Sequence, residues 1–234
     1  MSLNYTSYIS QVSELLALDS PANPEFALII PGMIDYAEQR IYRELDLLQT
    51  VVRNSTNSTT LNSRNAAIPN TFVTVQSINV ITPAGTLPDN GTRVPLQPVS
   101  RDFVDYAWPN ISSAGVPNCF AMVDQWNIIV GPAANGAYRM EVIGTIRPAP
   151  LSVSNTTTFL TEHLPDLFVA ASMVYGSGWQ KNFGSQADDP GQSVSWENQY
   201  KTLIASAGLE EVRKKFEAQA WASRSPSPIA SPNR

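Results

Sequence analysis

Apolar residues at helical spacing mark the beginning of the chain. They recur every three or four residues from 5 to 18, and Asn4 is placed to cap that helix. A longer pattern covers residues 24–48. Within it, Pro31 followed by Gly32 predicts a short helix and then a long one, because an interior proline removes a backbone hydrogen bond. Residues 1–50 are therefore predicted to form N-terminal helices.

The pattern changes between residues 51 and 150. Short β-branched runs separated by Pro, Gly and Asn are typical of strands joined by turns. We expect Ser100 to cap a brief helix over residues 100–106 and residues 123–126 to form a hairpin turn. The expected strands cover residues 65–68, 71–81, 93–97, 119–123, 126–130 and 138–145.

Helical spacing returns in the last third of the chain. Residues 164–183 are apolar on nearly all sides, which predicts the most buried helix, and its Gly176 and Gly178 would let another backbone approach. A last helix is expected over residues 191–222, with a solvated charged end at residues 210–215. Residues 151–222 are thus predicted to form C-terminal helices. Residues 223–234 carry too little apolar surface to fold alone and are predicted to form an extended tail.

Helices at both ends of the chain that enclose a run of strands predict an α+β fold. We expect a helical bundle formed by the N- and C-terminal helices, with the β-rich region over residues 51–150 inserted into it. Charged residues make up only 15% of the chain, against about 25% in average soluble domains. Neutral polar surface of this kind is typical of proteins that contact other proteins.

Charge and cysteine content exclude several classes of protein. The net charge of -5 argues against a protein that grips phosphate, because such binding needs clustered Lys and Arg. The single cysteine, Cys119, permits no internal disulfide and is expected in the core. No apolar run approaches the roughly 20 residues of a membrane span, and the first residues do not resemble a signal peptide. We therefore expect synthesis in the cytosol and no membrane partner.

Candidate chemistry is sparse. The one histidine, His163, lies at a predicted helix start with Thr161 or Asp166 as its cap, and is expected to be a surface polar group. No phosphate-binding loop or metal-binding motif occurs, so we expect no catalytic residue, no cofactor and no metal. Four tryptophans lie at core spacing and are expected in the core or at subunit contacts: Trp126, Trp179, Trp196 and Trp221.

Paired carboxylates leave an enzymatic alternative open. Two acids can hydrolyse a glycosidic bond, so a cell-wall hydrolase would use Glu38 with Glu44, or Asp102 with Asp105. Solvated helix faces explain these four acids better. A second alternative is a protein that binds glycans through its tryptophans and its Asn-rich loop over residues 54–64.

Several segments in a fixed order carry a family resemblance. They are residues 5–9, the stretch 30–45 (IPGMIDYAEQRIYREL), residues 98–103, residues 138–152, the stretch 155–167 (NTTTFLTEHLPDL) and residues 196–200. Their order resembles the head-tail adaptor, or connector, proteins of short-tailed bacteriophages. The resemblance covers nearly the whole chain. In a phage, the two alternatives above would be a tail-associated cell-wall hydrolase and a tail protein that binds host glycans.

The resemblance implies a structural protein of the virion neck, assembled in the host cytoplasm and without enzymatic activity. It implies a ring of twelve copies that joins the portal protein to the tail nozzle and tail fibres. Double-stranded DNA would pass through the lumen without specific binding.

Interface residues are expected at two places. Arg40 and Arg43 would contact acids of the adjacent copy, although pairing with Glu38 or Glu44 in the same helix explains them equally well. Contact with the portal or a neighbouring copy is assigned to the end of the chain, at Trp221, Arg224, Pro226, Pro228 and Ile229.

Overall fold

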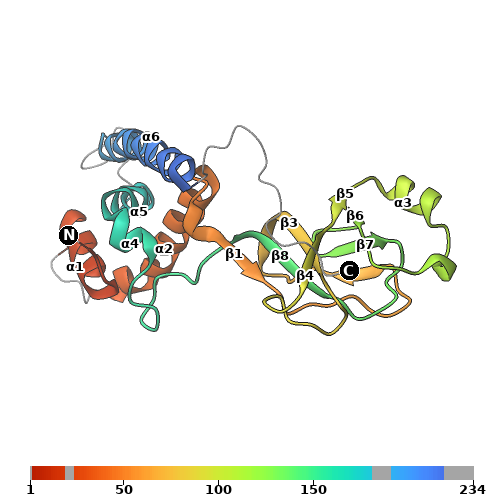
Figure 1. Cartoon of the computed structure of the whole chain (residues 1–234). Helices are drawn as coiled ribbons and strands as arrows, with labels where there is room; N and C mark the ends of the chain where they lie inside the picture. Colours follow the sequence, from red (N-terminus) through yellow and green to blue (C-terminus); the bar gives the residue numbers. More distant parts are fainter. Residues whose placement is uncertain (1, 19–23, 181–190, 219–234) are drawn as a thin grey trace. The chain divides into compact units, whose positions relative to one another are not determined.

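The computed structural model describes residues 2–18, 24–180 and 191–218 (Figure 1). The chain divides into two compact units. The helical unit comprises Met1–Leu48 and Ala149–Arg234, and the β unit comprises Gln49–Pro148. The predicted α+β class is confirmed.

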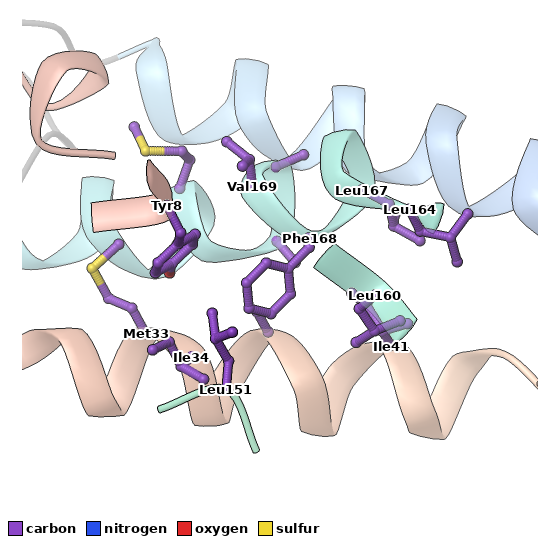
Figure 2. Close-up of a cluster of buried hydrophobic side chains, with 14 of the residues drawn as sticks. Tyr8, Met33, Ile34, Ile41, Leu151, Leu160, Leu164, Leu167, Phe168 and Val169 are labelled. Atoms are coloured by element: carbon purple, nitrogen blue, oxygen red, sulfur yellow. The ribbon is translucent and has the colours of Figure 1, made fainter. Parts of the chain in front are cut away.

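The helical unit is built around one cluster of buried apolar side chains, to which residues from both ends of the sequence contribute (Figure 2). Its centre includes Tyr8, Met33, Ile41, Phe168 and Tyr200, which are almost fully buried. The helices that supply it are α1 (Tyr5–Leu15), α2 (Pro24–Glu44), α4 (Phe159–His163), α5 (Pro165–Trp179) and α6 (Gln192–Ala218). As predicted, α5 is deeply buried, because apolar residues surround it on nearly all sides.

The continuity of α2 corrects one prediction. Pro31 lies inside a single helix and does not divide it. The proline leaves the carbonyl of Ala27 without its helical partner, and Ala27 is exposed, so water can bind that oxygen. Burial of Phe26, Ile30 and Ile34 on one face stabilises the helix on both sides of the proline.

Side-chain caps fix the helix starts. Asn4 caps α1 as predicted: its side chain accepts a hydrogen bond from the Ser7 N–H at 2.8 Å. The assignment of Thr161 or Asp166 as a cap beside His163 was wrong. Thr158 caps α4, and Thr161 serves as the reciprocal residue of that capping box, accepting from the Thr158 N–H at 2.9 Å.

Gly176 has a different role from the predicted one. A Cβ atom there would lie 2.9 Å from the Met33 Cε atom and 3.2 Å from a Leu16 methyl group. The missing side chain therefore makes room for the side chains of Leu16, just after α1, and Met33 of α2, and not for another backbone. At Gly178, apart from its chain neighbours and the backbone of its own helix, no atom of the described residues lies within 4 Å of such a Cβ position.

The β unit consists of two four-stranded sheets. Sheet A has the order β1-β8-β3-β4 and sheet B the order β2-β7-β6-β5. Neighbouring strands are antiparallel except β5 and β6. The strands are β1 (Val51–Asn54), β2 (Asn65–Ala67), β3 (Phe72–Thr82), β4 (Thr92–Pro95), β5 (Gln97–Pro98), β6 (Cys119–Met122), β7 (Asn127–Gly131) and β8 (Arg139–Ile146).

Three local predictions in the β unit are confirmed, whereas the strand expected over residues 93–97 is divided between β4 in sheet A and β5 in sheet B. Ser100 caps α3 (Arg101–Ala107) by accepting from the Phe103 N–H at 3.2 Å. The predicted hairpin joins β6 to β7, and Asp124 holds its turn by accepting from the Trp126 N–H at 2.8 Å. Cys119 is buried, as expected. Short 3-10 turns lie at Leu48–Thr50 and Ile111–Ser113.

Candidate interaction surfaces

Arg40 joins α2 to α6 through a bidentate ion pair. Its guanidinium donates to both carboxylate oxygens of Glu197 at 2.8 Å and to Glu44 at 3.1 Å. The guanidinium also lies 4.0 Å from the ring centroid of the fully buried Tyr200. The hydrogen bonds from Arg40 lower the pKa of Glu197, so the pair stays ionised.

These contacts favour an intrachain role for Arg40. Pairing with Glu44 in the same helix was one of the two alternatives, the other being contact with an adjacent copy. The bond to Glu197 spans 157 positions, so it could not be predicted from the spacing of residues along a helix. Arg43 donates from its Nε atom to the Gln39 carbonyl oxygen at 3.0 Å. The assignment of both arginines to an interface between copies remains a prediction.

Glu38 is a buried carboxyl group at the centre of the helical unit. Only 5% of it is exposed, and its Oε1 atom accepts a hydrogen bond from the Leu151 N–H at 2.9 Å. Burial raises the pKa of Glu38 to about 7, against the lowering effect of the Leu151 bond and with a smaller contribution from Asp35. The expectation that Glu38 lies on a solvated face was wrong.

Glu211 corrects the prediction for the charged end of α6. It is buried and accepts from the Leu48 N–H at 3.0 Å and from Lys214 at 2.8 Å. Its carboxylate therefore ties α6 to the segment that follows α2.

The burial of Glu38 and Glu211 could have been predicted from their spacing along the helix relative to apolar residues. Glu38 lies four residues after Ile34 and three before Ile41, on the buried face of α2. Glu211 lies four residues after the buried Ala207. An acid at such a position indicates a buried hydrogen bond.

The surface of α6 retains exposed apolar side chains. Leu209 and Val212 lie one turn apart and are 63% and 65% exposed. Leu209 also borders a groove of about 390 Å³ lined by residues of α4, α5 and α6, among them His163, Asp166 and Arg213. Exposed apolar residues next to one another on a helix are typical of a surface that contacts another protein.

A second groove lies in the β unit, beside an incomplete sheet edge. Strand β4 pairs only with residues 79–82 of β3, after which the chain crosses to sheet B at Gln97. The edge of β3 over residues 72–77 therefore has no neighbouring strand on that side among the described residues. The adjoining groove, of about 360 Å³, is lined by Phe72, Val73, Val75, Gln76, Ser77, Leu96, Pro98, Phe120, Met122 and Gln125.

The predicted residues at the end of the chain lie outside the described part of the structure. These are Trp221, Arg224, Pro226, Pro228 and Ile229. Of the other tryptophans, Trp196 packs against the helical core. Trp126 is 44% exposed in the β6–β7 turn, so it is not a core residue, and its place at a subunit contact remains a prediction.

Three of the four acids of the enzymatic alternative have structural partners. Glu38 accepts from Leu151, Glu44 pairs with Arg40, and Asp105 pairs with Arg64 at 2.5 Å. His163 is exposed at the end of α4, with its ring 4.7 Å from that of Phe159.

The described residues contain neither a cluster of metal ligands nor a helix that could span a membrane. Within residues 2–18, 24–180 and 191–218, no three His, Cys, Asp or Glu residues gather as metal ligands would. In the same part of the chain, no helix has both the length and the apolar character needed to cross a bilayer.

Comparison with known proteins places the chain in a class of phage structural proteins. A family model described as SU10 adaptor protein matches residues 3–231. The chain belongs to the SU10 adaptor protein family, which confirms the adaptor resemblance found in the sequence. It is therefore a phage adaptor protein and a component of the virion. No curated protein matches the chain.

Proposed function

We propose that this chain forms a closed ring of twelve copies that joins the portal protein to the tail, in the neck of the virion. The observation that carries the proposal is the adaptor family match over residues 3–231. The ring assembles in the host cytoplasm, and nozzle and tail-fibre proteins attach below it. The protein acts by binding and has no catalytic role.

The N- and C-terminal helices act in this proposal as one bundle that packs side by side with its neighbours. A ring requires a head-to-tail interface in which two different surfaces meet. The exposed Leu209 and Val212 of α6 supply one of these surfaces, because an apolar stripe gains free energy when a neighbour covers it.

The lumen of the ring is lined by the helical unit. The β unit carries six arginines (Arg53, Arg64, Arg93, Arg101, Arg139 and Arg147) against five acids (Asp89, Asp102, Asp105, Asp124 and Glu141). The net charge of the chain, -5, therefore comes from the acidic residues of the helical unit. Negative charge around the channel repels the DNA backbone, so the duplex passes without adhering.

The proposal is tested by measuring particle mass, with and without purified portal, for the full-length protein. We expect a ring alone or on the portal. The double variant Leu209→Asp, Val212→Asp should lose the ring, while Gln11→Asp, which adds charge at an exposed polar site on α1, should keep it. A protein that stays monomeric beside the portal, or that degrades cell-wall material, would refute the proposal.

A chain that ends at Ala222 tests the assigned role of the tail. We expect it to bind the portal or its neighbours more weakly than the full-length protein. Unchanged assembly and unchanged portal binding would show that residues 223–234 contribute to neither contact.

A further inference from the structure

The open half of β3 has the features of a site that accepts an additional strand. Its edge over residues 72–77 lacks a strand partner on one side among the described residues, so its N–H and C=O groups there face solvent or a ligand. Val73 and Met122, on the two walls of the adjoining groove, are 47% and 42% exposed. An extended peptide on such an edge gains main-chain hydrogen bonds and places alternate side chains in the groove.

The residues that line the groove indicate which kind of peptide could bind there. Among the described residues, the polar ones that line the groove are Gln76, Ser77 and Gln125, and none that lines it is charged. A charged segment would lose hydration there without gaining a partner. The fitting occupant is an extended and uncharged segment.

The end of this chain contains such a segment. Residues 225–233 (SPSPIASPN) carry no charge, and arginines flank them at 224 and 234. Serines precede all three prolines, and a residue before proline favours extended backbone.

The positions of the prolines are a second feature that suits this segment to the open edge of β3. In a strand, the N–H and C=O groups of successive residues point to opposite sides. Pro226, Pro228 and Pro232 all occupy even positions, so their missing N–H groups would all lie on one side. The odd positions, Ser225, Ser227, Ile229 and Ser231, keep every donor on the other side. This is the arrangement of an edge strand that bonds to one neighbour only.

We propose that residues 225–232 of one copy add as a strand to the open edge of β3 in a neighbouring copy. The choice of a neighbouring copy as the source of this added strand rests on the ring proposed under Proposed function. The odd positions bond to residues 72–77, and Ile229 adds apolar contact area. The prolines face outward, where they prevent a further strand from joining.

Disulfide trapping between two different full-length chains tests this contact. One chain carries Gln76→Cys in the groove, and the other carries Ser227→Cys in the tail. Cys119 is buried, so it does not compete. After mixing and mild oxidation, we expect a disulfide-linked pair of chains in the mixture and little in either protein alone.

Two proline variants on the Ser227→Cys chain supply the matched comparison. Ser231→Pro removes a donor on the bonding side and should lower the yield about tenfold, since one lost hydrogen bond in a strand is worth about that factor in affinity. Ala230→Pro adds the same ring on the outer side and should leave the yield within about twofold.

The inference is overturned if no linked pair forms, if both prolines act equally, or if the tail cysteine links to the portal and not to Gln76→Cys. Particle mass, measured on the same samples, separates the two proposals. Rings without the link contradict only the tail contact. Monomers that also ignore the portal contradict the ring itself.

Discussion

Replacing Glu38 with glutamine should stabilise the helical unit at neutral and alkaline pH. The carboxyl group of Glu38 is buried, and its pKa rises from an ordinary value of 4.5 to about 7. The folded protein therefore holds a proton there that the unfolded chain has already released between pH 4.5 and 7. Stability from this group is complete below pH 4.5 and is lost as the pH rises through 7.

The size of the effect follows from the shift in pKa. One pKa unit corresponds to about 1.4 kcal/mol, so ionised Glu38 costs the folded state about 3 kcal/mol at pH 8. Glutamine cannot ionise, and its carbonyl oxygen can still accept the Leu151 N–H. Glu38→Gln should thus match the wild type at pH 4 and exceed its stability by up to about 3 kcal/mol at pH 8.

Urea unfolding between pH 4 and pH 8, followed by the circular dichroism of the helices, measures this difference. Glu14→Gln, at an exposed position of α1, is the control and should change little at any pH. If the wild type and Glu38→Gln show the same dependence on pH, or if the variant is weaker at pH 8, the assignment of Glu38 as a buried neutral acid is wrong.

Two further ion pairs give sharp expectations. Arg40→Ala should lower the stability of the helical unit by about 2 kcal/mol, because the partly buried Glu197 loses its bidentate partner and keeps only the weaker ion pair with Lys201 at 3.4 Å. A double-mutant cycle with Glu197→Gln in urea unfolding should show that most of this loss is coupling between Arg40 and Glu197. In the β unit, Arg93 holds the pKa of the buried Glu141 low. Stability from Glu141 should therefore be present above its ordinary pKa and decline as the pH falls, and thermal melts at pH 3 to 7 should show a weaker decline in Arg93→Ala.

Local signals in the sequence predicted the elements of this fold well. The caps at Asn4 and Ser100 and the hairpin turn at Asp124 depend on residues within three positions of one another, so their chemistry is visible in the sequence. The prediction that Pro31 divides the helix was wrong, because the loss of one helical hydrogen bond costs little free energy where the freed carbonyl is exposed and the flanking residues are buried.

The candidate surfaces depended on distant contacts and were harder to predict. Glu197 reaches Arg40 only because α6 packs near α2, which no spacing rule encodes. The open edge of β3 exists because the chain leaves sheet A after Pro95. The residue at which two strands stop pairing cannot be predicted from the sequence alone. The interface residues proposed at the end of the chain came from the family resemblance, and mixing experiments now have to test them.

The way in which the β unit joins the chain has a consequence for the evolution of these proteins. The polypeptide enters through β1 and leaves through β8, and these two strands pair directly, with Val51 opposite Thr145. Paired residues in antiparallel strands lie only about 5 Å apart. A phage lineage can therefore exchange, enlarge or trim this module by recombination at two adjacent points while the helical unit keeps its sequence.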